Sequence, residues 1–357
     1  MKSLDIAQAR LSNQLLGKKK CKKPGEVVAW LGAVQAQDFA AAKWALGLRM
    51  SKATDAAIEQ AFNDGAILRT HVMRPTWHFV LPQDIRSLLA LTAPRVHAAN
   101  AHMYRKLELD NDLLSRCHVV FTKALRSEKY LTRSELANRL AENRIEAAGQ
   151  RVAYIIMHAE LEALICSGPR RGKQFTYALL EERAPQAKKL RRDEALAQWT
   201  LRYFAGHGPA QLKDFAWWSG QTLQDAQRGL DLAAPQLAHE IIDSKIYWFS
   251  PNTKTVKLRT PTALLLSIYD EYTIAYKDRS ALGGERYIEK LLSMGNALTS
   301  VLIVDGKLAG TWKRAVKKGT VEIVTNPFRQ LSKDEYEAVK AEAARYGEFL
   351  EMPSALS

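Results

Sequence analysis

Two glutamines two residues apart, Gln35 and Gln37, are the side chains whose type and spacing point most directly to chemistry. They stand in the segment VQAQDF at 34–39, which joins apolar stretches at 27–34 and 40–48. Residues two apart point to nearly opposite sides of a helix, but to the same side of an extended chain. At such a junction the two amides either cap backbone groups or face a cleft together.

An amide cannot act as a general base at neutral pH, so glutamines at a reactive site work by positioning. The carbonyl oxygen can accept a hydrogen bond from an attacking water and turn its dipole toward a positive charge. The NH2 group can donate to a phosphate or hold the oxygen of the water. Gln35 and Gln37 are therefore the candidate catalytic residues. Asp38 is a weaker candidate for a local base, because it fits at least as well as the N-cap of a helix beginning near Ala40.

The charge of the chain favours a polyanionic partner. Among 357 residues, 52 Lys and Arg stand against 38 Asp and Glu, a net charge of +14. Each phosphate that Lys or Arg neutralises releases condensed counterions, so a surplus of this size is typical of proteins that bind nucleic acid. The hydrophobic fraction of 47% is that of an ordinary globular protein.

No motif indicates a metal or another cofactor. The sequence has no GxGxxG, P-loop, HExxH or GxSxG pattern, and its three cysteines are scattered without a CxxC pair. Neither His71 with His78 nor His97 with His102 has ligand spacing with a supporting carboxylate. The longest apolar stretch, at 263–268, is too short for the roughly 20 residues that span a bilayer. We expect a cytoplasmic protein with no cofactor, no metal and no membrane partner.

Residues 1–100 have the pattern of a winged helix, a variant of the helix-turn-helix. Helical patterns cover 4–16, a second helix begins at Glu26, and a third covers 55–62. Strand patterns follow at 67–72 and 76–80, separated by the turn Met73-Arg74-Pro75.

The same order recurs twice. In residues 101–190, one helix is predicted over 111–126, a second begins at a capping box at Thr132, and a third covers 150–166. A basic turn at 167–173 and a strand over 174–179 follow. In residues 191–257, helices are predicted over 193–204, 210–218 and 222–232, with paired strands in 238–249.

Residues 258–357 change character. A hairpin is predicted at 301–312 around Asp305-Gly306, which suits a type I′ turn, and a strand over 320–325 is followed by a helix over 333–349. The expected fold is mainly α with small β elements, consisting of three tandem winged helices and a C-terminal β-rich domain closed by a helix.

Basic side chains cluster on the predicted hairpins, where they are placed to contact backbone phosphates. Those next to the glutamines are Arg69, His71, Arg74 and His78. Those on the second wing are Arg170, Arg171 and Lys173, and those on the C-terminal hairpin are Lys313, Arg314 and Lys317.

Four segments together resemble the AlkZ-like family of winged-helix DNA glycosylases. They are the Gln-x-Gln segment at 32–38, the stretch LRTHVMRPTWH at 68–78, the YDEY motif at 269–272 with Asp278-Arg279, and DGK…GTW at 305–312. A related branch carries Gln-x-Asp, so Gln37 places this chain with the Gln-x-Gln branch. The resemblance implies tandem winged helices and excision of bulky N7-alkylated purines, including interstrand crosslinks.

The resemblance therefore predicts a monofunctional glycosylase that hydrolyses the N-glycosidic bond in double-stranded DNA carrying alkylated purines. We expect a nucleoid-associated monomer with no obligate protein partner. The alternative is a non-catalytic winged-helix DNA-binding protein or transcriptional regulator. The helix at 150–166 disfavours a regulator, since after Gln150, Arg151 and Tyr154 it becomes apolar and reads bases poorly.

Two further expectations concern packing. Trp217 and Trp218 are expected in the core of the third unit rather than against DNA. Asp270 and Glu271 are expected to pair with Arg279, or with another base, at a junction between domains.

Overall fold

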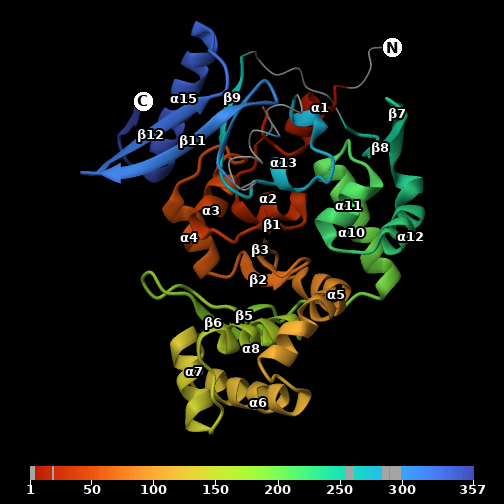
Figure 1. Cartoon of the computed structure of the whole chain (residues 1–357), viewed down its shortest axis with the longest axis vertical. Coiled ribbons are helices and arrows are strands. Elements are labelled where there is room, and N and C mark those ends of the chain that lie inside the picture. The colour runs from red at the N-terminus through yellow and green to blue at the C-terminus, as the bar shows by residue number, and fades with distance from the viewer. Residues whose placement is uncertain (1–4, 18–19, 254–260, 284–288, 290–298) are drawn as a thin grey trace.

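The computed structural model describes residues 5–17, 20–253, 261–283, 289 and 299–357. Helices make up nearly half of the chain, and the described strands form four sheets. The N-terminal part lies at the centre, with residues 111–179 below it, residues 192–249 to one side and the C-terminal sheet to the other (Figure 1). No helix in the described ranges is long and apolar enough to cross a bilayer.

The first unit begins after a short helix, α1 (Ile6–Asn13). Its elements are α2 (Pro24–Leu31), β1 (Val34–Gln35), α3 (Phe39–Gly47), α4 (Asp55–Asn63), β2 (Leu68–Val72) and β3 (Thr76–Val80). The strand order is β1-β3-β2. The expected helices and strands are present, and the unit also contains β1 and α3. These two arise because the Gln-x-Gln segment is extended and Asp38 then starts a helix, accepting from the Ala41 N–H at 2.9 Å.

The second unit follows a 22-residue helix, α5 (Ile85–Lys106), in which the boundary expected at residue 100 falls. Its elements are α6 (Asn111–Glu128), β4 (Leu131–Thr132), α7 (Arg133–Glu142), α8 (Gly149–Leu161), β5 (Ile165–Ser167), β6 (Thr176–Leu179) and the short α9 (Leu180–Arg183). Thr132 and Glu135 form the expected capping box.

One helix of the second unit is shorter than the sequence predicts. The helix expected over 150–166 ends at Leu161, and residues 165–167 form strand β5 instead. Ala163 has a φ of 55°, which breaks the helix, and Ile165 then pairs with Leu179 of β6. The apolar periodicity continued through the break because both the end of the helix and the strand are buried.

The third unit consists of α10 (Arg192–His207), α11 (Leu212–Ser219), α12 (Leu223–Ala233), β7 (Ala238–Ile242) and β8 (Lys245–Phe249). Ala210 bridges Trp248, so a short extended segment after the first helix pairs with the last strand. The first and second units have the same pairing, with β1 on β3 and β4 on β6. All three units therefore share one order of helices and one hairpin arrangement.

The C-terminal part is built on a five-stranded sheet with the order β13-β12-β11-β10-β9. Its elements are β9 (Ala263–Leu266), α13 (Glu271–Ile274), β10 (Val301–Val304), β11 (Lys307–Lys317), β12 (Thr320–Pro327), α15 (Lys333–Leu350) and β13 (Ser354–Leu356). Asp305 and Gly306 both have positive φ, 49° and 81°, as a type I′ turn requires. The boundary expected between 257 and 258 lies outside the described residues.

The C-terminal sheet shares one hydrophobic core with the first unit. Trp44 of α3 packs against Tyr346 and Phe349 of α15, with ring centroids 4.8 and 5.0 Å apart. Its indole N–H donates to the Leu265 carbonyl at 2.7 Å. A second core joins β2 and α5 to the third unit, whereas the second unit has a core of its own.

A buried ion pair closes the contact between the first unit and the C-terminal part. Arg49 donates from both terminal nitrogens to the two oxygens of Asp270, each at 2.8 Å, and both side chains are fully buried. The remaining Arg49 donors reach the carbonyls of Ala45 and Gln14. A buried guanidinium with every donor used is stable, whereas the carboxylate left behind without it is strongly destabilising.

We predict that Arg49→Met lowers the free energy of unfolding by about 3–5 kcal/mol, because it leaves the Asp270 carboxylate buried and unpaired. The measurement is equilibrium denaturation in urea. Arg228 provides a matched control, since it makes a bidentate pair with Asp193 at 2.7 and 2.6 Å on the exposed surface. Arg228→Met should lower the free energy of unfolding far less, because water and salt screen an exposed ion pair. Equal effects of the two variants would contradict the role given to the buried pair.

Candidate active site

Gln35 is buried, and both its backbone and its side chain are hydrogen-bonded. Its backbone N–H donates to Oε1 of Glu271 at 3.0 Å, and its side-chain Oε1 accepts from Arg74 at 3.0 Å. It is 7% exposed and stands opposite His78 in the β1–β3 pair. The guanidinium can only donate, so Arg74 fixes which end of the amide is the oxygen and turns the NH2 group away from itself.

Gln37 is exposed. The Ala36 N–H donates to the Trp77 carbonyl at 2.7 Å, so pairing with β3 continues past Gln35. The Trp77 N–H in turn donates to Oε1 of Gln37 at 3.3 Å. β1 ends at Gln35 and Gln37 follows in a bend, so Gln35 is buried while Gln37, two residues later, is exposed and accepts from the backbone of β3. Asp38, also exposed, accepts from the N-terminus of α3, as the capping interpretation predicts.

The charges around Gln35 are fixed by burial. Burial, and next the positive charge of Arg74, lower the pKa of His78 to about 4, so this imidazole is neutral at physiological pH. Its Nδ1 lies 3.0 Å from the Thr76 carbonyl, which requires a proton on that nitrogen. Burial raises the pKa of the Glu271 carboxyl, but hydrogen bonds from His207 and the Gln35 N–H outweigh burial and hold that pKa below its ordinary value.

Asp270 and Glu271 each have a basic partner at a junction, as expected, although the partner is not Arg279: Asp270 pairs with Arg49, and Glu271 lies 3.3 Å from Nε2 of His207. Glu271 also accepts from the Gln35 N–H and from the Trp218 indole, both at 3.0 Å. Trp218 is buried as expected, but Trp217 is 38% exposed, and the Arg74 guanidinium lies 5.4 Å from its ring centroid. No local pattern indicates that Glu271 or Trp217 lies near Gln35, because each reaches it from a distant part of the chain.

Two of the basic residues expected on the first hairpin face inward. Arg69 is 7% exposed, donates to the Ala36 carbonyl at 2.9 Å and lies over the rings of Trp77 and Phe175. Burial lowers its pKa to about 10, at which the guanidinium still carries its charge at neutral pH. His71 is 5% exposed and bonded to Glu160 of α8. These contacts join the first hairpin to the second unit.

The hairpin of the second unit lies beside the Gln-x-Gln segment. Phe175 packs against Phe39, the residue that follows Asp38, with ring centroids 5.1 Å apart. Arg170 is ion-paired with Glu59 at 3.0 Å, and Arg171 is exposed but paired with Glu135. Lys173 is exposed at the tip.

The third basic group lies on β11. Lys313 and Arg314 are exposed, and Arg314 donates to the Tyr346 hydroxyl. Lys317 is paired with Glu322 at 2.6 Å near the end of the hairpin. Burial raises the pKa of Tyr346 to about 12. Tyr346 packs against Trp44 of α3, the helix that Asp38 caps, so the base of this hairpin is joined to the first unit through α3.

The groups around the Gln-x-Gln segment can hold a water and a sugar by fixed dipoles. These groups are the two glutamine amides, the neutral His78 imidazole, the buried Glu271 carboxylate and the Arg74 guanidinium. Rigid groups of this kind stabilise charge without reorganising. Among the described residues, the side chains around Gln35 and Gln37 form no group spaced to bind a metal ion.

Comparison with known proteins agrees with the four motifs. Residues 28–349 match the family described as DNA glycosylase AlkZ-like. The interstrand DNA cross-link repair glycosylase of Streptomyces sahachiroi is 24% identical over 358 residues, 94% of this chain and 93% of that protein. The solved structure of S. sahachiroi DNA glycosylase AlkZ covers 99% of this chain and 98% of its own, with a TM-score of 0.79 at 17% identity, and thus has the same fold. The chain therefore belongs to the AlkZ-like DNA glycosylase family.

Proposed function

We propose that the protein is a monofunctional DNA glycosylase that hydrolyses the N-glycosidic bond of N7-alkylated purines in duplex DNA. The observation that carries this proposal is the pair Gln35 and Gln37, two residues apart, with both carbonyl oxygens held by protein N–H donors. Only Gln37 is exposed, so it is the group that meets the sugar or the water, while Gln35 is held below it by Arg74 and Glu271.

The chemistry requires little acid or base help. An N7-alkylated purine already carries a positive charge and leaves readily, and the bond breaks with positive charge developing on the sugar. Each amide oxygen has a second lone pair, which can accept from the attacking water and face that charge. Water as the nucleophile leaves an abasic site with the strand intact. Asp38 remains the local carboxylate for a base, although its present bond is to the helix.

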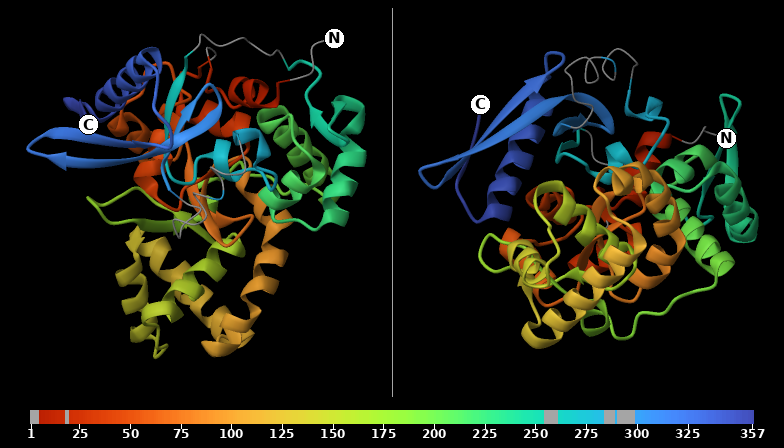
Figure 2. Two further views of the ribbon diagram at one scale, coloured as in Figure 1. Left: turned by 45° about the horizontal axis from the view of Figure 1, so that its top comes forward. Right: turned by 60° about the horizontal axis from the view of Figure 1, so that its bottom comes forward.

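We further propose that the three units are winged helices that grip the DNA backbone. The loop at 168–175 and the β11–β12 hairpin project from the same side of the molecule in all three views (Figures 1 and 2). The loop packs on Phe39 at the start of α3 through Phe175, and the hairpin reaches α3 through Tyr346, which packs on Trp44. Exposed cations on two such arms suit phosphates on either side of a lesion.

The Streptomyces relative is described as repairing interstrand cross-links. We extend this to the present chain and propose that bulky adducts, including crosslinked purines, are substrates. The exposed position of Gln37 supports acceptance of bulk. We propose that a monomer is sufficient, since three units within one chain surround the site.

We predict that Gln37→Ala and Gln35→Ala lower the rate of base release by roughly 10²–10³, the effect of removing one fixed transition-state contact. The assay is single-turnover release from duplex DNA carrying one N7-alkylguanine, with and without alkali to separate base excision from strand cleavage. Gln227, an exposed glutamine on α12, provides the matched control, and Gln227→Ala should keep the wild-type rate.

DNA binding by both variants should stay within a few-fold of wild type. If the wild-type protein binds DNA in a salt-sensitive way but releases no base from simple or crosslinked adducts, the function is that of a non-catalytic DNA-binding protein. If both glutamine variants keep the wild-type rate, the catalytic group lies elsewhere.

We predict that Lys173→Ala and Lys313→Ala each weaken binding to any duplex. Each should reduce the slope of log affinity against log salt by about 1, the contribution of one phosphate contact. The measurement is fluorescence anisotropy over a series of salt concentrations. Lys123→Ala on α6, at the far end of the molecule, should leave the slope unchanged (Figure 1). An equal change in the slope for all three lysine variants would mean that only the total charge of the protein matters, and not the position of each lysine.

A further inference from the structure

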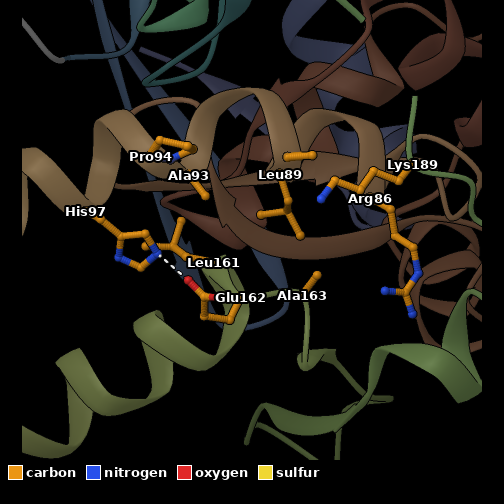
Figure 3. Close-up of a pocket in the computed structure, with 10 residues that line it drawn as sticks. Arg86, Leu89, Ala93, Pro94, His97, Leu161, Glu162, Ala163 and Lys189 are labelled. Atoms are coloured by element: carbon orange, nitrogen blue, oxygen red, sulfur yellow. Dashed lines mark ion pairs between the residues drawn. The ribbon is translucent and has the colours of Figure 1, made fainter. Parts of the chain in front are cut away.

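Four imidazole and carboxylate groups gather where α5, α6 and α8 meet. His97 of α5, His158 of α8 and Glu162 at the end of α8 each offer a ligand atom, and these atoms all lie within 4.8 Å of one another. Nε2 of His97 lies 3.0 Å from Oε1 of Glu162, and both residues line a surface cavity of about 350 Å³ (Figure 3). His118 of α6 stands next to His158, 3.2 Å from ring nitrogen to ring nitrogen.

The hydrogen bonds of the two ligand histidines use the nitrogens that point away from Glu162. Nδ1 of His97 is bonded to the Tyr104 hydroxyl at 2.9 Å, and Nδ1 of His158 to Nε2 of His118. Nε2 of His97 is buried without a hydrogen bond in the described structure, although the carboxylate is within reach. The 3.0 Å contact between Nε2 of His97 and Oε1 of Glu162 is an ion pair, which a metal ion bound between the two groups would replace.

We propose that His97, His158 and Glu162 bind one divalent transition-metal ion, for which Zn²⁺ is the best match. Two imidazoles and a carboxylate form a zinc ligand set in which the fourth position holds water. Bonds of 2.0–2.2 Å in a tetrahedron place ligand atoms about 3.3 Å apart. The His97–Glu162 separation already has this size, and Glu162, which is half exposed, is free to rotate toward His158.

The surroundings of the site have the features that support metal ligands. Tyr104 and His118 contact the outer nitrogens of His97 and His158, as partners that fix the ring orientation of ligating histidines do.

The location suggests what the ion does. Ala93 and Val96, on the same stretch of α5 as His97, belong to the core shared with the third unit, whereas His158 and Glu162 belong to the second unit. A metal that bridges them fixes the second unit, and with it the loop at 168–175, against the rest of the molecule. Its ligands are separate from the residues that surround Gln35, so the ion takes no direct part in the proposed glycosylase reaction.

The test uses tag-free full-length protein stripped with a chelator. Titration with Co²⁺, followed by its visible absorption, should saturate at one equivalent with the intense bands of a tetrahedral ion, and Zn²⁺ should displace it. Glu162→Gln and His158→Ala should each weaken binding roughly tenfold or more, and His118→Ala should weaken it less. His102→Ala, an exposed histidine on α5, is the matched control and should bind as wild type.

Zn²⁺ should also raise the melting temperature of the stripped wild-type protein but not that of Glu162→Gln, whose exposed side chain is not needed for folding. Absence of saturable Co²⁺ binding to the wild type would overturn the proposal. So would binding that is the same in Glu162→Gln and His102→Ala, because the ion would then be held elsewhere.

Discussion

The bidentate pair between Arg49 and Asp270 joins two parts of the chain that are 221 residues apart, without exposure to water. The next residue, Glu271, accepts from the Gln35 N–H and from Trp218. One dipeptide thus fixes the C-terminal part, the first unit and the third unit against each other. The Gln-x-Gln segment is thereby held from outside the first unit as well as from within it, because the Gln35 N–H donates to Glu271.

The electrostatics of the site follow from that closure. Burial keeps the His78 imidazole neutral, whereas the hydrogen bonds that Glu271 accepts keep the Glu271 carboxylate ionised. Arg74 is the cation that contacts Gln35, and its hydrogen bond to Oε1 orients the amide. A site built from fixed dipoles suits a leaving group that brings its own positive charge, because orientation rather than proton transfer limits such a reaction.

Basic residues of this chain divide into two groups that their sequence does not distinguish. Arg69, His71 and Arg170 are engaged in contacts that hold the units together. Lys173 and Lys313 are exposed on two arms that project from one side of the molecule. The net charge of +14 therefore overstates the number of groups available to phosphates, since part of it stabilises the fold.

The sequence by itself determined most of the elements: the helices of the second and third units apart from the end of α8, the capping box at Thr132 and the Asp305-Gly306 turn. These depend on residues within a few positions of each other, so periodicity and turn chemistry reveal them. The sequence did not predict α3, and it left open whether Gln35 and Gln37 cap backbone groups or face a cleft. Only the tertiary structure decided that Glu271 and Trp217 belong beside Gln35, and that histidines of three helices meet at Glu162. Such contacts join residues 40 to more than 200 positions apart, and they depend on how buried surfaces pack, which no local pattern encodes.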